Sequence, residues 1–304
     1  MRISVLVTSY GRRPYLERCI GSLLAQGRPP DEIVIVTRSG DADTEAWVGE
    51  RAAAARGPVH VRHVRVDEPG VLAATRAGLR AVRGDVVAFI DDDAAARQGW
   101  LSRIEAWFAR EPRLGALGGR DVIEGEPEER ADQVGRITWY GRVIGNHEKA
   151  FSGSAKVEHL KGVNMSFRRD LLPEPDPHIL GNAHHYEMDL CFAVRRLGYD
   201  VVYDGDLVVD HFHAAPRTLP AHRRGDPERE FFIHRNRVYV MAKHLGPARR
   251  ALFLFYSAVF DTGPHWLEAL RGSGEVSLPM VVAMYRGKLA GLRAYRRQRR
   301  QSSA

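Results

Sequence analysis

The sequence has few cysteines and no long apolar run. Its two cysteines, Cys19 and Cys191, lie far apart and form no Cys-x-x-Cys motif, which indicates free thiols in a reducing compartment. Residues 1–8 lack the apolar core of a signal peptide and predict a buried strand instead. Two apolar stretches, residues 251–260 and 278–285, are each about half of the ~20 residues that a membrane-spanning helix needs. They predict helix cores or an interfacial surface, and we expect a cytoplasmic protein.

Acidic residues are missing from the C-terminal tail. From Arg286 onward the chain has seven basic residues and no acidic one, and its other 38 basic residues balance the 38 acidic ones. The net charge of +7 therefore belongs to the tail. The tail favours peripheral binding to an anionic membrane at its inner face, with a frayed solubilising terminus as the alternative. No nucleic acid is expected as a partner, because the arginines are not interleaved with aromatic residues.

Strand-like and helix-like segments alternate through residues 1–120. Short apolar runs predict strands at residues 3–8, 32–37, 59–66 and 86–90. Helical apolar spacing predicts helices at residues 14–26, 44–55, 71–82 and 100–110. This order predicts an α/β fold with a mostly parallel sheet that helices cover on both faces. The later elements are expected at residues 163–167, 187–197, 199–203, 207–211, 231–245 and 250–260, after a break at residues 121–154.

Three consecutive carboxylates, Asp91, Asp92 and Asp93, follow the apolar run at residues 86–90. Open α/β sheets bind ligands at the carboxyl ends of their strands, which is where these residues are expected. Three carboxylates so close together repel one another, and a divalent cation such as Mn²⁺ or Mg²⁺ would relieve that repulsion. A solvated acidic turn or a helix N-cap is the alternative interpretation of the triplet.

Four blocks of the sequence stand in a characteristic order: residues 4–12, residues 70–101 with the aspartate triplet, residues 162–169, and residues 187–211. In this order and spacing they resemble family 2 glycosyltransferases, which are inverting enzymes with the GT-A fold, over roughly residues 3–245. The resemblance implies a Rossmann-like, mostly parallel sheet with a helical C-terminal extension. It also implies a donor-binding half at residues 1–120 and an acceptor-binding, catalytic half at residues 121–215. Residues 216–304 are expected to form the extension.

The resemblance implies transfer of a sugar from a nucleotide-diphosphate sugar to an acceptor hydroxyl, in glycan, polysaccharide or glycoconjugate biosynthesis. Asp91 and Asp93 match the family's Asp-x-Asp pair, and His211 ends a strand where relatives often carry a metal-binding histidine. Asp91, Asp93 and His211 are therefore the expected ligands of Mn²⁺ or Mg²⁺, with His213 a weaker candidate and a strand-end structural role the alternative for His211. The expected donor-binding residues are Thr8, Tyr10, Arg38, Arg76, Asp91 and Asp92.

The family's catalytic base, usually an aspartate in a Glu-Asp pair, corresponds to Glu187 in this sequence. Asp189 is the second candidate for the base, and both acids could instead only favour a helix N-terminus. Gly162, Asn164 and His185 are expected on the acceptor side. The acceptor itself could be a glycan, a lipid-linked molecule or a small molecule.

Two departures from the family lie on the donor side. Arg38 stands where relatives carry an aspartate, and Thr75 precedes Arg76 where they carry a different sequence. A guanidinium cannot accept a hydrogen bond from a base N–H, so the nucleotide base is not assigned. The alternatives are a nucleotide-sugar-binding scaffold without turnover and, with weaker support, a sugar nucleotidyltransferase, whose glycine-rich basic loop is missing here.

Overall fold

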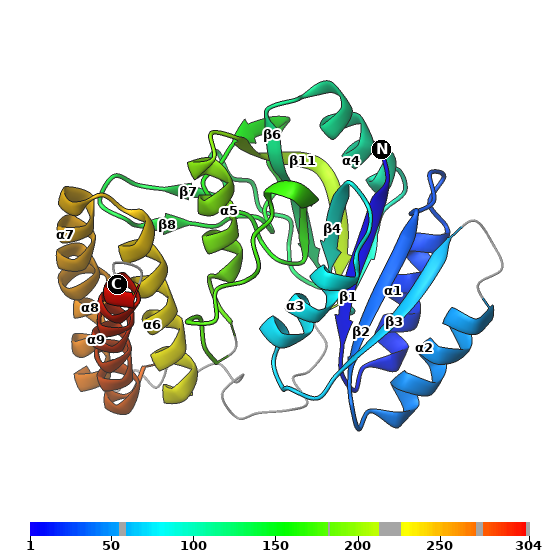
Figure 1. The fold of residues 1–304 in the computed structure, drawn as a ribbon. Helices are drawn as coiled ribbons and strands as arrows, with labels where there is room; N and C mark the ends of the chain where they lie inside the picture. Colours follow the sequence, from blue (N-terminus) through cyan, green and yellow to red (C-terminus); the bar gives the residue numbers. More distant parts are fainter. Residues whose placement is uncertain (55–58, 182, 213–225, 272–275, 302–304) are drawn as a thin grey trace. The chain divides into compact units, whose positions relative to one another are not determined.

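The computed structural model describes residues 1–54, 59–181, 183–212, 226–271 and 276–301 (Figure 1). The chain divides into two compact units. Unit 1 comprises Met1–Arg136, Gly145–Glu174 and Leu190–Ala215, and unit 2 comprises Ile137–Ile144, Pro175–Asp189 and Pro216–Ala304. Among the described residues, no helix combines the length and the apolar character that crossing a membrane requires.

The strands belong mainly to unit 1. They are β1 (Ile3–Ser9), β2 (Glu32–Arg38), β3 (His60–Val66), β4 (Val86–Ile90), β5 (Ala94–Ala96), β6 (Leu114–Ile123), β7 (Arg136–Ile137), β8 (Val143–Ile144), β9 (Ser154–Lys156), β10 (Asn164–Arg168) and β11 (Asp200–His211). The helices are α1 (Arg13–Leu24), α2 (Ala42–Ala54), α3 (Val71–Ala81), α4 (Trp100–Arg110), α5 (Tyr186–Arg196), α6 (Pro227–His244), α7 (Pro247–Tyr256), α8 (Gly263–Arg271) and α9 (Leu278–Gln301). A 3₁₀ turn, η1 (Arg169–Leu171), and a π-helical turn, η3 (Ser257–Asp261), complete the described elements.

The described strands of unit 1 form one nine-stranded sheet in the order β3-β2-β1-β4-β10-β6-β11-β5, with β9 paired to β11 (Figure 1). Strands β3, β2, β1 and β4 are parallel to one another, and β6 is parallel to β11. Strand β10 lies between β4 and β6 and is antiparallel to both. The carboxyl ends of β1, β2 and β4 therefore meet at one edge of the sheet, where ligands bind in open α/β sheets.

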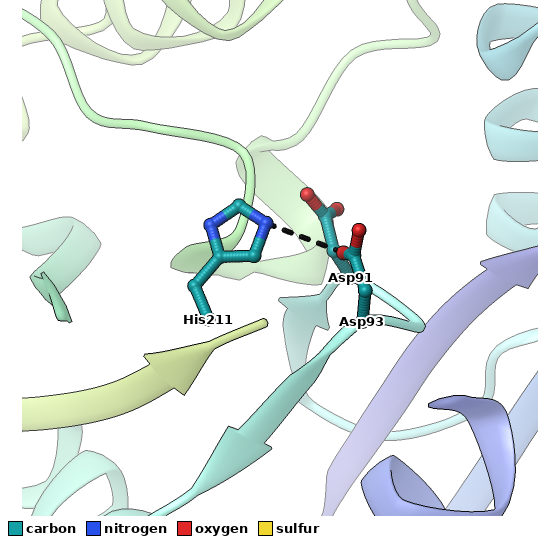
Figure 2. Close-up of side chains that lie close together, drawn as sticks. All are labelled: Asp91, Asp93 and His211. Carbon is teal, nitrogen blue, oxygen red and sulfur yellow. Dashed lines mark ion pairs between the residues drawn. The ribbon is translucent and has the colours of Figure 1, made fainter. Parts of the chain in front are cut away.

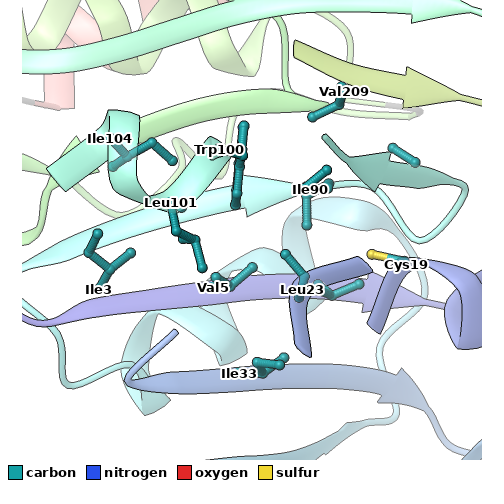
Figure 3. Close-up of a cluster of buried hydrophobic side chains, with 14 of the residues drawn as sticks. Ile3, Val5, Cys19, Leu23, Ile33, Ile90, Trp100, Leu101, Ile104 and Val209 are labelled. Carbon is teal, nitrogen blue, oxygen red and sulfur yellow. The ribbon is translucent and has the colours of Figure 1, made fainter. Parts of the chain in front are cut away.

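Alternating residues of the strands bury opposite faces of the sheet. Ile3, Val5 and Ile33 face the helices α1, α2 and α4 in one apolar cluster (Figure 3). On the other face Leu6 packs against α3, where a Cβ added at Gly78 would collide with it. Helices thus cover both faces, as the βαβα order of the sequence predicts.

The predicted elements of residues 1–110 are present close to their expected bounds, but the sequence did not predict strand β5, nor strands β6 to β9 after it. Strand β5 consists of three alanines, which have little β propensity. Strand β6 contains Gly118 and Gly119, which sequence patterns associate with weak strands. Glycine is needed at Gly119, because an added Cβ would overlap the backbone oxygen of Leu207, whereas a Cβ at Gly118 would meet the end of the Leu160 side chain.

The prediction of two short strands at residues 199–203 and 207–211 was wrong, since β11 is one strand of twelve residues. The polar sequence Asp204, Gly205, Asp206 is typical of a turn, yet the strand continues through it with a shift in register. Asp204 is fully buried and accepts hydrogen bonds from Arg103 and Trp107 of α4. These partners satisfy a carboxylate that the sequence suggests is in solvent.

Candidate active site

The aspartate triplet lies at the carboxyl end of β4, directly after the buried residues 86–90. The backbone N–H of Ala94 donates to the Asp91 carbonyl, and this turn leads into β5. Strand β5 runs antiparallel to β11, with Ala94 opposite His211. The short alanine strand therefore places Asp93 next to the end of β11.

Asp91, Asp93 and His211 converge on one point, as Figure 2 shows. One potential ligand atom from each residue lies within 4.8 Å of the others. His211 Nε2 is 3.3 Å from Asp93 Oδ1. Asp93 and His211 are buried, whereas Asp91 is exposed. His213, the weaker metal candidate, lies outside the described residues.

The charges of the triplet are poorly compensated by the protein. Burial, with a smaller contribution from the charge of Asp93, raises the pKa of Asp91 to about 7, although the residue keeps solvent contact. Burial also raises the pKa of Asp92 to about 6, even though the nearby Arg12 opposes the shift. Carboxylates with raised pKa values at the end of a sheet are a typical signature of a site that awaits a cation.

The last residue of β1 and one residue of the β1–α1 connection contact the triplet. The Ser9 hydroxyl donates to Asp92 Oδ2 over 2.6 Å. The Arg12 guanidinium donates to both Asp92 and Asp93, at 3.2 and 3.1 Å. These contacts orient Asp92 toward protein partners and leave the second oxygen of Asp93 facing His211.

Asp121, which the sequence did not indicate as a site residue, orients His211. Asp121 is fully buried on β6, and its Oδ1 lies 2.9 Å from His211 Nδ1. Its other oxygen forms an ion pair with Lys161. Burial opposes these interactions, but they lower the pKa of Asp121 to about 2 and raise that of His211, which also contacts Asp93, to about 10. The only sequence signal was an acid in a strand otherwise rich in glycine and apolar residues.

The three converging side chains fit a divalent metal ion. Two carboxylates and one imidazole match the donor types that Mn²⁺ and Mg²⁺ sites use, with the imidazole favouring Mn²⁺ over Mg²⁺. The carboxylate of Asp121 holds the far nitrogen of His211, an arrangement that fixes the ring of a metal-binding histidine. The Asp121–His211 pair thus leaves Nε2 directed at Asp93.

The predicted donor-binding residues of β1 and β2 lie together at the same edge of the sheet. Thr8 pairs with Val36 in the parallel register, so the residues that follow each strand are neighbours. The Arg38 guanidinium lies 5.1 Å from the centroid of the Tyr10 ring. This pair presents a planar cation and an aromatic face, which suit a nucleotide base or ribose. Arg76 is half-buried on α3.

The predicted acceptor residues of unit 1 are buried. Gly162 precedes β10, and Asn164 is its first residue. The Asn164 amide donates to Arg120 and Leu207 carbonyls at 3.0 and 2.8 Å and accepts from the Trp100 indole. These bonds tie β10 to β6, β11 and α4, so the amide of Asn164 is engaged by the protein itself.

Glu187, Asp189 and His185 belong to unit 2 and lie around the first turn of α5. Glu187 is half-buried. His185 and Ala183 both have positive φ angles, 73° and 61°, just before the helix. Such backbone conformations are unfavourable outside glycine and often occur at functional sites.

Asp189 has partners on α6. Both of its oxygens accept from Lys243 Nζ, at 2.8 and 3.0 Å, and Oδ1 also lies 2.7 Å from His244 Nε2. Lys243 extends the network to Asp176 at 2.7 Å, which in turn accepts from the Tyr239 hydroxyl. Asp189 is therefore a buried carboxylate that Lys243 and His244 both hold in place.

Comparisons with known proteins agree with this arrangement. The chain is 28% identical over 231 residues to a glucosyl-dolichyl phosphate glucuronosyltransferase of Haloferax volcanii, covering 69% of each chain. Its structure is similar to that of a mannosyltransferase from Pyrobaculum calidifontis in complex with GDP-Man and Mn²⁺, with a TM-score of 0.58, 18% identity, and coverage of 96% of this chain and 87% of that one.

A second similar structure is that of GalNAc-T7 with UDP, GalNAc and Mn²⁺, with a TM-score of 0.63 and 15% identity. It matches 91% of this chain, which spans 55% of the length of GalNAc-T7. At these identities the likeness shows the fold, which is GT-A, as the resemblance in the sequence implies.

The sequence model for glycosyl transferase family 2 matches residues 4–174, which is more than half of the chain. This match includes the aspartate triplet, the ends of β1 and β2, and the buried turn before β10. The chain therefore belongs to glycosyl transferase family 2 and is a glycosyltransferase.

Proposed function

We propose that the protein is an inverting, metal-dependent glycosyltransferase that uses a nucleotide-diphosphate sugar as donor. The observation that carries this proposal is the convergence of Asp91, Asp93 and His211 beside the ends of β1 and β2. The mannosyltransferase and GalNAc-T7 structures contain Mn²⁺ together with GDP-Man or UDP, which supports the same ligand classes here. We also propose that residues 1–120 bind the donor and that residues 121–215 bind the acceptor.

Asp91, Asp93 and His211 would hold Mn²⁺ or Mg²⁺, with Asp121 fixing the histidine ring. When bound, such a cation supplies a Lewis acid that stabilises negative charge on the departing diphosphate. Arg12 contributes a fixed positive charge beside Asp92 and Asp93. Tyr10 and Arg38 would contact the nucleoside, together with Thr8 and, from α3, Arg76.

The transfer step is a single displacement with inversion. The acceptor hydroxyl oxygen forms a bond to the anomeric carbon, and the bond from that carbon to the diphosphate oxygen breaks. The nucleoside diphosphate leaves with the electron pair, and the hydroxyl proton passes to a carboxylate base on the opposite side. We assign this base to Glu187, which matches the position of the family's base in the sequence, and we give Asp189, which Lys243 and His244 hold, a structural role.

The acceptor-side residues of the proposal are Gly162, Asn164 and His185. Because the Asn164 amide already bonds Trp100, Arg120 and Leu207, its role would be to hold β10 in place rather than to bond the acceptor. The glucuronosyltransferase relative is described as acting on glucosyl-dolichyl phosphate, which favours a lipid-linked acceptor over a free small molecule.

The proposal is tested by donor turnover. The protein is incubated with UDP- and GDP-sugars and candidate acceptors, with Mn²⁺ or with EDTA, and the released nucleoside diphosphate and the product's anomeric configuration are measured. We expect release that requires Mn²⁺ and a product of inverted configuration. Tight donor binding without turnover across the acceptor panel would instead identify a binding scaffold, and a retained configuration would exclude the single displacement.

A further inference from the structure

The outward face of α9 carries apolar and cationic residues and no acid. Residues recurring every three or four positions are exposed along the helix, which places them in one stripe. The stripe contains Leu278, Val282, Arg286, Leu289, Arg293, Arg296, Arg297 and Arg300. Leu289 is 57% exposed, and Leu278 and Val282 are each 43% exposed. We call this set the α9 stripe.

The opposite face of α9 packs against the rest of unit 2, so the α9 stripe faces outward. Helices α6 and α9 lie side by side within unit 2 (Figure 1). A Cβ added at Gly287 or Gly291 would overlap the backbone oxygens of Phe231 and Arg235 on α6, so the two helices are in close backbone contact. Lys288 is buried in the same face and donates to Thr262 and to the Ser257 carbonyl. The stripe is therefore held rigidly outward.

More large apolar side chains are exposed on the neighbouring elements of unit 2. Phe255 is 58% exposed, Phe260 61%, and Leu267 and Leu270 of α8 are 56% and 69% exposed. Of the sixteen large hydrophobic residues exposed among the described residues, nine lie between residues 255 and 289. Such a concentration of exposed apolar side chains marks an interaction surface rather than ordinary scatter.

A groove between α7 and α9 combines positive charge with an apolar floor. Its volume is about 570 Å³. Its lining contains Arg250, Arg296, Arg299 and Arg300 together with Leu254, Leu292 and Tyr295, and no acid. The Arg250 guanidinium lies 4.6 Å from the centroid of the Tyr295 ring. Arginines above aliphatic side chains match a phosphate headgroup with the first carbons of its acyl chains.

We propose that the α9 stripe and the α7–α9 groove dock unit 2 onto an anionic lipid bilayer, with α9 lying along the membrane surface. Leucine and valine side chains enter the headgroup region, and the arginine stems extend so that the guanidinium groups contact lipid phosphates. A second copy of the chain is a poor occupant, because two acid-free stripes would repel. Nucleic acid would leave the exposed leucine, valine and phenylalanine side chains without partners. The proposal is independent of the donor and metal chemistry.

The full-length protein is tested by co-sedimentation with vesicles of phosphatidylcholine, with and without phosphatidylglycerol. We expect binding that requires phosphatidylglycerol and decreases with added salt. The double substitution Arg293→Glu and Arg297→Glu should lower partitioning by at least about tenfold, because each basic side chain near an anionic surface contributes on the order of a few-fold. Val282→Ser with Leu289→Ser should weaken binding at unchanged net charge.

The matched control reverses two exposed arginines of unit 1, Arg2→Glu with Arg83→Glu, which changes the net charge equally. This control should bind vesicles like the unaltered protein. The proposal would be overturned if the control lost as much vesicle binding as the double arginine substitution in α9, or if the unaltered protein bound equally well to vesicles without phosphatidylglycerol. It would also be overturned if the protein were a dimer that Val282→Ser with Leu289→Ser converts to a monomer, or if it preferred a DNA duplex to the vesicles at equal salt.

Discussion

Two groups of carboxylates, one in each unit, differ in how their charges are compensated. In unit 1, Asp91, Asp92 and Asp93 are adjacent, and within the described part of the chain Arg12 and His211 bring positive charge directly to Asp92 and Asp93. In unit 2, Asp176 and Asp189 share Lys243 between them. Each of those two carboxylates also has another partner, Tyr239 or His244.

The difference appears in the pKa values. Burial raises the pKa of Asp91 and of Asp92 to about 7 and about 6. Burial also acts on Asp176, but hydrogen bonds from Lys243 and Tyr239 lower its pKa well below its ordinary value. We therefore expect the paired group to stabilise unit 2, and we expect the repulsion within the crowded group to be relieved when a cation binds. Under the proposed function, the same residue type serves structure in one unit and ligand binding in the other.

The largest effect is expected for Asp93→Asn, which removes a ligand from the crowded group. Transfer that requires Mn²⁺ should fall to background, while the free energy of unfolding of the metal-free protein stays constant or increases because one like charge is gone. The measurements are steady-state nucleotide release and urea unfolding. Asp206→Asn, on an exposed residue of β11, is the control and should leave both unchanged. A large loss of stability in Asp93→Asn would contradict the comparison.

Glu187→Gln should reduce the transfer rate by roughly 10²-fold or more, the scale of losing a general base, with donor binding intact. Asp189→Asn should mainly reduce stability, because it disrupts the pairs with Lys243 and His244. Rates measured at saturating donor separate the two effects. Normal transfer by Glu187→Gln, together with lost transfer by a folded Asp189→Asn, would move the base to Asp189.

Lys243→Met should destabilise the protein by about 3 kcal/mol, because it leaves two buried carboxylates without their shared cation. Lys156→Met is the matched control, since its pair with Asp200 is exposed and should contribute less than about 1 kcal/mol. Urea unfolding of both variants gives the comparison. Equal small losses would mean that the carboxylates of unit 2 are no better compensated than a surface pair.

Asp121→Asn should weaken Mn²⁺ binding by about 10- to 100-fold, the range for residues that orient a metal-binding histidine. The amide keeps the shape of the side chain but no longer carries the charge that holds His211 and Lys161. Titration calorimetry with Mn²⁺ alone measures the effect without turnover. The control Asp200→Asn, earlier on β11, should bind Mn²⁺ normally, and normal binding by Asp121→Asn would remove the orienting role.

The smallest expected effect is on the pH dependence of the free energy of unfolding, to which Asp92 in unit 1 and Asp176 in unit 2 contribute with opposite signs. The folded-state pKa of Asp92 is above its unfolded value, so its unfavourable contribution is absent below about pH 4 and complete above about pH 6. In EDTA, the free energy of unfolding of Asp92→Asn, compared with that of the unaltered protein, should therefore increase by about 1–2 kcal/mol between pH 4 and pH 7. Asp176 contributes stability above its unfolded pKa that is lost in acid, so Asp176→Asn should show the reverse trend.

The sequence predicted the first part of the fold well, because buried strands and amphipathic helices alternate there with clear periodicity. The aspartate triplet at the end of an apolar strand indicated Asp91 and Asp93, the family resemblance added His211, and the structure brings the three side chains together. The sequence did not predict Asp121, whose role depends on β6 and β11 being parallel neighbours. Sequence patterns also miss β5, because three alanines acquire strand structure only by pairing with β11.

The distinction between Glu187 and Asp189 also depended on tertiary contacts. Both acids lie in the first turn of α5, and the sequence gives each the same helix-dipole explanation. The pairing of Asp189 comes from Lys243 and His244, more than fifty positions later in the chain. Local patterns contain no information about such a pair.

The most direct test of the account is the thermal stability of the protein with UDP or GDP, with and without Mn²⁺, for the unaltered chain and for Asp93→Asn. For a nucleotide at about 100 times its Kd, the account predicts an added stability of about 2.7 kcal/mol that requires Mn²⁺ and is absent in Asp93→Asn. An equal gain without Mn²⁺, or one that survives in Asp93→Asn, would contradict the claim that the crowded carboxylates are a metal-dependent nucleotide site.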